Sequence, residues 1–357
     1  VTVMILIMNA PVMMTAIAGT IISINTALSQ VLGISASLQI NELLFVNNTT
    51  YEDQYRCCNV CPRRCGVDRT AGQLGVCKAP AVLRIGRAAL HWWEEPCLVG
   101  DQGSGAVFFS YCPLGCVYCQ NEDLVAGAGV EVGFEQFKQT LLRLQNEEHA
   151  ANINLVTPSH YVPTIAEALA QLRQGSRFDS DSHLHIPVMY NTSSYDSVES
   201  LKLLRGLVDI YLADFKYVTP EIAQRFSHAV NYPSVALAAL DEMVTQISSW
   251  EEDERGLLQK GIIVRHLVLP GQIEESLRVL KVLHERYGGS IRLSIMNQYT
   301  PLREDLVRYG LSGKVSDEEY ETVLDYADFL GIEDYFWQEG GAATESFIPA
   351  FDGTGVV

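Results

Sequence analysis

Short apolar runs alternate with amphipathic helical patterns along most of this chain, and this alternation constrains the fold more than any other feature. Six runs have the length and composition of buried strands, at residues 106–110, 152–157, 186–190, 208–215, 262–270 and 291–296. Helical spacing of apolar residues occurs at 134–148, 163–174, 197–207, 233–250, 274–287 and 317–331. Strands that alternate with helices predict a parallel sheet of βα units, although chain order does not distinguish an open sheet from a barrel.

Composition narrows the class of protein. The chain has 357 residues, which suits one large domain or two ordinary ones. With 48% hydrophobic and 19% charged residues it can bury a sizeable core, so global disorder is excluded. Lys and Arg number 25 against 43 Asp and Glu, and the formal net charge is −18. We therefore expect no nucleic-acid partner, because such a chain has no general attraction for phosphate backbones.

The first 41 residues carry no charged side chain, and residues 10–24 are apolar apart from Thr and Gly. A secretory signal needs a basic region before its apolar run, and a membrane helix needs about 20 mostly apolar residues, often with a basic flank. The missing base and the interruptions at Asn9, Pro11, Asn25 and Gln30 disfavour both. We expect residues 1–50 to be a poorly ordered or spurious leader, with a membrane tether as the alternative.

All nine cysteines lie between Cys57 and Cys119. An odd number in a long chain does not suit a secreted disulfide framework and indicates metal ligation. Cys112, Cys116 and Cys119 stand at CxxxCxxC spacing just after a predicted strand. Three such thiolates can bind three irons of a four-iron four-sulfur (4Fe-4S) cluster and leave the fourth iron open. The alternatives are a zinc site, which would need a fourth ligand, or ordinary buried thiols.

Cysteines also gather upstream of that trio. A second set of four thiolates comprises Cys58, Cys61, Cys65 and Cys77. Their spacing suits a structural zinc ion or a second iron–sulfur cluster equally, and packed reduced thiols are the alternative. Cys97 is expected to be a buried thiol. The neighbouring segment Trp92-Trp93-Glu94-Glu95 is expected to pack the N-terminal module on the sheet domain, with substrate contact as the alternative.

The stretch GSGAVFFSYCPLGCVYCQN resembles the radical S-adenosylmethionine (radical SAM) superfamily, whose signature CxxxCxΦC has an aromatic residue, here Tyr118, before the last Cys. Other segments resemble the pyruvate formate-lyase activating enzymes, namely CCNVCPRRCGVDR, LHWWEEPC, LVTPSHYVP, YNTSSY, DIYLADFKY, VRHLVLPG and NQYTPL. They cover about residues 55–350. The implied fold is a partial (β/α)6 TIM-like barrel (101–315) after a Cys-rich module (51–100), followed by a C-terminal helix and tail (316–357).

The resemblance also implies a chemistry. Cys112, Cys116 and Cys119 would bind the 4Fe-4S cluster, and its open iron would chelate S-adenosylmethionine. One electron would then break the C5′–S bond of that cofactor, and the 5′-deoxyadenosyl radical would abstract a hydrogen atom. The protein's task would be to position and shield the radical.

Polar residues follow the predicted strands, where a parallel barrel places its ligand groups. They are Thr157, Ser159, His160, Asn191, Ser193, Asp214, Lys216, Arg265, His266, Asn297 and Gln298. By resemblance, the 157–160 turn takes the place of the GGE segment, absent here, that grips the cofactor's amino group. Asn191 and Ser193 would contact its ribose or carboxylate. Asp214 and Lys216 contact the cofactor or form a salt bridge, and each residue has a structural role as its alternative.

The expected function is therefore reductive cleavage of S-adenosylmethionine with hydrogen abstraction, and the resemblance implies the glycine of a glycyl-radical enzyme as the hydrogen donor. Radical modification of another protein, peptide or small molecule is the alternative within the class. A non-catalytic protein that binds zinc or an iron–sulfur cluster, and a membrane-tethered redox protein, are alternatives outside it. A flavodoxin or ferredoxin is the electron donor that the resemblance implies, and an oxygen-sensitive cluster predicts a cytoplasmic location.

Overall fold

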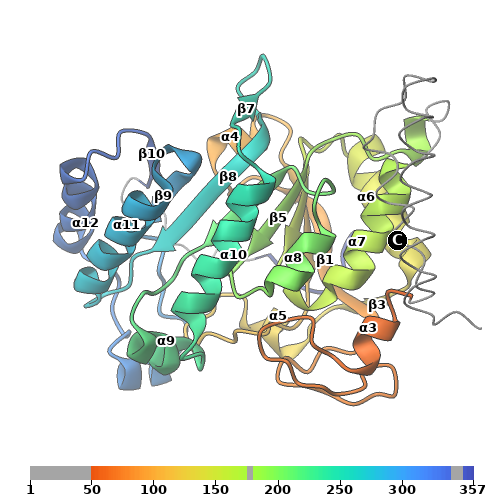
Figure 1. The fold of residues 1–357 in the computed structure, drawn as a ribbon, viewed down its shortest axis with the longest axis horizontal. Coiled ribbons are helices and arrows are strands. Elements are labelled where there is room, and N and C mark those ends of the chain that lie inside the picture. Colours follow the sequence, from red (N-terminus) through yellow and green to blue (C-terminus); the bar gives the residue numbers. More distant parts are fainter. Residues whose placement is uncertain (1–49, 175–179, 339–348) are drawn as a thin grey trace, which may run out of the picture. The chain divides into compact units, whose positions relative to one another are not determined.

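The computed structural model describes residues 50–174, 180–338 and 349–357, and residues Tyr51–Val357 form one compact unit (Figure 1). The leader predicted for residues 1–50 lies outside the described residues, apart from Thr50. Within the described ranges, no helix combines the length and the apolar character that crossing a bilayer requires.

A single large sheet forms the centre of the unit, with the strand order β10-β9-β8-β6-β5-β4-β2-β1-β3 and with β7 paired to β8. Seven neighbouring strands run parallel, namely β2 (Ser104–Phe109), β4 (Ile153–Val156), β5 (Val188–Thr192), β6 (Ile210–Asp214), β8 (Leu258–Leu267), β9 (Arg292–Met296) and β10 (Tyr335–Trp337). Three pair antiparallel, namely β1 (Leu83–His91), β3 (Val130–Val132) and β7 (Glu251–Glu252). The carboxyl ends of the parallel strands therefore meet at one edge.

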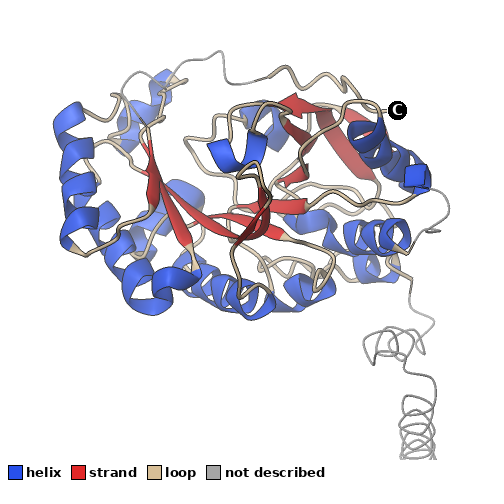
Figure 2. Ribbon diagram, turned by 90° about the horizontal axis from the view of Figure 1, so that it is seen from above, coloured by secondary structure: helices blue, strands red, loops and turns tan. Residues whose placement is uncertain are grey.

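The described strands form an open path from β10 to β3, so they do not close into a barrel. Figure 2 shows the sheet curving, with most of the helices along one side of it. β4 and β5 are buried along their whole length, as expected for parallel strands covered on both faces. The predicted mixed α/β fold is confirmed, and the curved open sheet has the layout of a partial barrel.

Helical periodicity located the main helices well. The six predicted helices are α6 (Phe134–Asn146), α7 (Val162–Arg173), α8 (Val198–Leu203), α10 (Tyr232–Gln246), α11 (Ile273–Tyr287) and α12 (Asp317–Phe329). Four short helices were not predicted, namely α3 (Asp53–Arg56), α4 (Pro96–Val99), α5 (Glu122–Ala126) and α9 (Pro220–Ser227). β1 lies in the predicted Cys-rich module but is a strand of the main sheet. The functional division into module, barrel and tail stays a prediction.

Candidate functional site

A cavity of about 540 Å³ lies at the carboxyl edge of the parallel strands. Residues that follow or end β2, β4, β5, β6, β8 and β9 line it, together with the segment after β1. Of the predicted site residues, the lining includes Cys112, Cys116, Tyr118, Cys119, Thr157, Asn191, Ser193, Asp214, Lys216 and Arg265. The sheet thus brings together groups that are far apart in the sequence.

The cysteine trio occupies the loop between β2 and α5. Tyr111 and Gly115 have φ values of +72° and +64°, so the loop turns sharply on either side of Cys112. The Cys112 Sγ accepts a hydrogen bond from the Leu114 N–H at 3.4 Å. Burial, followed by the charge of neighbouring thiols, raises the pKa of Cys112 to about 11 and that of Cys119 to about 12. Partly buried thiols that repel one another as thiolates need a cation to ionise together.

The cysteine trio has the donor chemistry of an iron–sulfur site, since thiolates are the usual protein ligands of such clusters. In the described part of the chain, no three His, Cys, Asp or Glu side chains converge as the ligands of one metal ion do. In a cluster each thiolate binds a different iron. The donor set of this loop fits three thiolate ligands of a cluster, in which iron would compensate the thiolate charge.

Three hydroxyl groups form a buried chain that ends on Cys116. The Tyr118 and Tyr217 hydroxyls lie 2.6 Å apart, and Tyr217 Oη lies 3.0 Å from Ser227 Oγ. Ser227 in turn donates to Cys116 Sγ at 3.0 Å. The aromatic residue of the CxxxCxΦC signature is thus connected through α9 to one of the thiols. Hydrogen bonds to ligand sulfurs are among the features that set cluster potentials.

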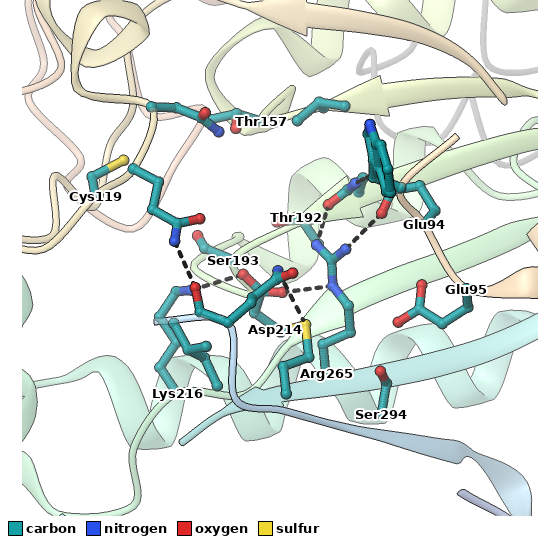
Figure 3. Close-up of a pocket in the computed structure, with 18 of the residues that line it drawn as sticks. Glu94, Glu95, Cys119, Thr157, Thr192, Ser193, Asp214, Lys216, Arg265 and Ser294 are labelled. Carbon is teal, nitrogen blue, oxygen red and sulfur yellow. Dashed lines mark hydrogen bonds and ion pairs between the residues drawn. The ribbon is translucent and has the colours of Figure 1, made fainter. Parts of the chain in front are cut away.

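Away from the cysteines, Arg265 organises the cavity wall (Figure 3). Its guanidinium donates to Asp214 Oδ1 at 3.0 Å, to Glu94 Oε2 at 2.9 Å and to Asn191 Oδ1 at 2.9 Å. Lys216 Nζ donates to the other oxygen of Asp214 at 2.7 Å. The predicted salt bridge between Asp214 and Lys216 is therefore present, and Arg265 extends it to a second carboxylate.

This network keeps its members charged although they are buried. Burial opposes ionisation of Asp214, but Lys216 and Arg265 hold its pKa below the ordinary value. Burial likewise opposes the charge on Arg265 and Lys216, but Asp214 raises the pKa of both, with Glu94 adding to the effect on Arg265. Each basic group in the wall already has an anionic partner within the protein.

The segment after β1 contributes to the cavity wall. Glu94 and Glu95 line the cavity, so this segment, for which packing was the main expectation and substrate contact the alternative, reaches the candidate site. Trp92 and Trp93 remain more than half exposed. His91 also lines the cavity, and burial and then the charge of Arg265 lower its pKa to about 4. The available signal was an acidic pair between Trp and Pro, but nothing local shows that it turns inward.

Four of the predicted strand-end residues, Ser159, His160, His266 and Asn297, lie outside the cavity lining. The Ser159 hydroxyl lies 3.4 Å from that of Thr192, and His160 Nε2 lies 2.8 Å from the Ser110 carbonyl oxygen. His266 lies between the Phe215 carbonyl and the Ser276 hydroxyl. The side chains of Ser159, His160 and His266 face the core because they support neighbouring strands and helices, so the structure does not bring them to the cavity.

The second cysteine set lies in the loops after α3. Cys58, Cys61 and Cys77 are buried and Cys65 is partly exposed. Burial raises the pKa of Cys61 to about 12 and also raises that of Cys77, and in each case neighbouring thiols of the set add to the effect. The four thiols are therefore close enough to influence one another. Their side chains do not converge as the ligands of one metal ion do, and metal binding by this set stays a prediction.

Cys97 packs as a thiol. It lies beside an apolar group that includes Leu98, Met189 and Ile263. Burial, then the charge of Glu95, raises the pKa of Cys97 to about 12. Cys97 is partly rather than fully buried, so the expectation of a buried thiol is met only in part.

Comparison with known proteins gives limited information. No model of a known protein family matches the chain. An uncharacterised protein of Methanocaldococcus jannaschii is 25% identical over 293 residues, which cover 78% of this chain and 76% of that protein.

Solved structures of similar fold include SuiB of Streptococcus suis, with a TM-score of 0.44, 12% identity and coverage of 67% of this chain and 49% of SuiB. The match thus spans about half of the length of SuiB. A radical SAM methyltransferase from Sphaerobacter thermophilus has a TM-score of 0.42 and 12% identity, over 66% of this chain and 69% of that one.

Proposed function

We propose that this protein is a radical SAM enzyme. The observation that carries the proposal is the placement of Cys112, Cys116 and Cys119 on the wall of a cavity that polar residues at several strand ends also line. Three thiols in that position fit a cluster that keeps one iron open toward the cavity. The non-catalytic alternative gives no reason for a cavity of about 540 Å³ beside the thiols.

In this proposal the protein binds the cluster and S-adenosylmethionine, orients them and shields the radical from water. Cys112, Cys116 and Cys119 would hold the 4Fe-4S cluster. With S-adenosylmethionine bound, such a cluster would supply reductive cleavage of that cofactor and hydrogen abstraction. Thr157, Asn191 and Ser193 are the polar lining groups from β4 and β5 that are placed to orient the cofactor.

The substrate step is the finer part of the proposal. The similarity of eight segments to pyruvate formate-lyase activating enzymes supports a glycyl-radical enzyme as the hydrogen donor, with a flavodoxin or ferredoxin as the electron source. Another peptide or a small molecule is the alternative substrate. Electron paramagnetic resonance of a candidate glycyl-radical partner, incubated with the reduced protein and S-adenosylmethionine, distinguishes them: a glycyl signal supports the first, and its absence with continued cofactor cleavage supports the second.

The assignment to the radical SAM class is tested by anaerobic reconstitution of the protein, with quantification of iron, sulfide and 5′-deoxyadenosine. Wild-type protein should bind about four irons at this site and cleave S-adenosylmethionine on reduction. Cys116→Ala should lose cleavage and the cluster of this site, whereas Cys57→Ala, at an exposed thiol, should retain both. Cleavage retained by Cys116→Ala, or zinc without iron in the wild type, would overturn the proposal.

The second cysteine set is tested in the same preparations. We propose that Cys58, Cys61, Cys65 and Cys77 bind one zinc ion or a second cluster. Cys61→Ala should then lose one zinc or about four irons while the trio retains its own iron. Unchanged metal content in Cys61→Ala would show that these thiols are structural only.

A further inference from the structure

We propose that Glu95 recognises the substrate by binding a positively charged nitrogen, an ammonium or guanidinium group, at the end of the cavity away from the cysteine trio. Figure 3 shows Cys119 and Glu95 at opposite ends of the labelled residues. The inference deepens the proposed function and rests on it, because it names the class of molecule that the radical would meet.

The Glu95 carboxyl group lines the cavity but is not fully bonded. The side chain is only 8% exposed. Ser294 from β9 lies near the carboxyl group, whereas Oε2 is buried and has no hydrogen-bond partner. Among the described residues that line the cavity, Glu95 alone has a buried side-chain polar atom without a partner. An unpaired buried carboxyl oxygen destabilises the protein, so a ligand that completes it gains that energy.

The charges around Glu95 select a cation. Arg265 faces it from β8, and Glu94 and Cys97 face it from its own segment. Arg265 is already bonded to Glu94 and Asp214, and Lys216 to Asp214. Lys216 and Arg265 thus form ion pairs with Asp214 and Glu94, and Glu95 is a third carboxyl group that forms an ion pair with neither. An anionic ligand would be repelled by Glu94 and by an ionised Glu95, whereas a cation completes the balance.

Aromatic side chains around this end suit the same class of ligand. Phe336 of β10 is paired in register with Ser294, which lies near Glu95. Tyr335, Phe336 and Trp337 line the cavity. Aromatic faces attract ammonium and guanidinium groups, most strongly where water is excluded. The net charge of −18 also favours the approach of cations over anions.

The protonation state of Glu95 distinguishes a cationic ligand from a neutral one. Burial and the charge of Glu94 raise its pKa, although Arg265 opposes the rise. A bound cation stabilises the ionised carboxylate, so binding should release a proton. A neutral ligand would accept a hydrogen bond from the protonated acid and release none.

The experiment uses reconstituted protein saturated with S-adenosylmethionine, so that the probe does not compete for the cofactor site. Calorimetry compares n-butylammonium with n-butanol and butyrate, each in two buffers of different ionisation enthalpy. The proteins are the wild type, Glu95→Gln, Glu95→Asp and, as matched control, Glu254→Gln at an exposed position. We expect n-butylammonium to bind with proton release in the wild type and control, and about tenfold more weakly without release in Glu95→Gln.

Each result of this experiment bears differently on the cation site and on the proposed function. Equal affinity of wild type and Glu95→Gln for n-butylammonium, or preference for butyrate or n-butanol, would overturn the inference. If Glu95→Gln fails to fold, Glu95→Asp keeps the test open, because proton release that persists with reduced affinity supports the carboxylate as the partner. Wild-type cleavage of S-adenosylmethionine without any amine binding refutes this inference alone. Amine binding without cleavage in the wild type refutes the proposed function and leaves the cation site.

Discussion

Arg265 Nη1 donates a hydrogen bond to Glu94 Oε2 at 2.9 Å and so joins β8 to the segment after β1, 171 residues away in the chain. The two side chains are 14% and 8% exposed. The same guanidinium binds Asp214 and Asn191. One residue thus fixes the acidic segment in the cavity and links three parallel strands at their carboxyl edge.

The first prediction concerns this contact. Arg265→Met should lower the free energy of unfolding by about 3–5 kcal/mol, because it leaves buried carboxylates without their cation. Adding Glu94→Gln should restore part of the loss, with a coupling energy on the order of 1–3 kcal/mol. Urea denaturation of the double-mutant cycle measures both. The exposed pair of Arg286 and Asp241 is the control, and Arg286→Met should have a much smaller effect. If the effects of the two substitutions on the free energy of unfolding were strictly additive, the coupling between Arg265 and Glu94 would be contradicted.

The second prediction concerns acid stability. The Phe215 carbonyl can only accept, so His266 carries its proton on Nδ1 and accepts from Ser276 at Nε2. Burial lowers the pKa of His266 to about 4 from 6.5. The unfolded chain therefore binds a proton that the folded protein does not, and stability should fall as pH drops from about 6.5 through about 4.

The loss attributable to His266 should reach up to roughly 3 kcal/mol. Unfolding free energies measured between pH 7 and pH 4 should depend less on pH in His266→Gln than in the wild type. His185→Gln, at an exposed position, serves as control and should follow the wild type. Parallel pH profiles for wild type and His266→Gln would rule out this role.

The third prediction concerns the hydroxyl chain at Cys116. Ser227→Ala removes the hydrogen bond to Cys116 Sγ. Loss of a donor to a ligand sulfur destabilises the reduced, more negative cluster, so the reduction potential should fall by an amount on the order of tens of millivolts. Spectroscopic redox titration of reconstituted protein measures the potential. Ser248→Ala, at an exposed position, should leave the potential unchanged. A potential in Ser227→Ala equal to that of the wild type would count against a role for the hydroxyl chain.

The fourth prediction concerns strain at the end of β4. Thr157 lines the cavity with a φ of +60°, which is unfavourable for a β-branched residue. Thr157→Gly should be more stable than Thr157→Ala by about 1 kcal/mol, since only glycine removes the steric cost of this backbone conformation. Thermal unfolding of the two variants provides the comparison, and both lose the hydroxyl group. A less stable Gly variant would mean that the backbone is not strained here.

The local sequence was sufficient to predict the core strands and helices. β4 and β5 are buried along their length, so they appear as short apolar runs, and α6 and α11 carry one apolar face. β1 includes two arginines and is only partly buried, while β10 has three residues. Such strands have no clear pattern because their pairing partners, rather than their own composition, stabilise them.

For the site, spacing determined the cysteine trio, since a loop of eight residues can present three thiols without help from the rest of the chain. Adjacency likewise determined the ion pair of Asp214 with Lys216. The tertiary structure alone decided that Glu94 and Glu95 face the cavity and that His160 and His266 face the core. The physical reason is that the direction of a buried polar side chain depends on a partner such as Arg265, which only the folded sheet brings within hydrogen-bonding distance.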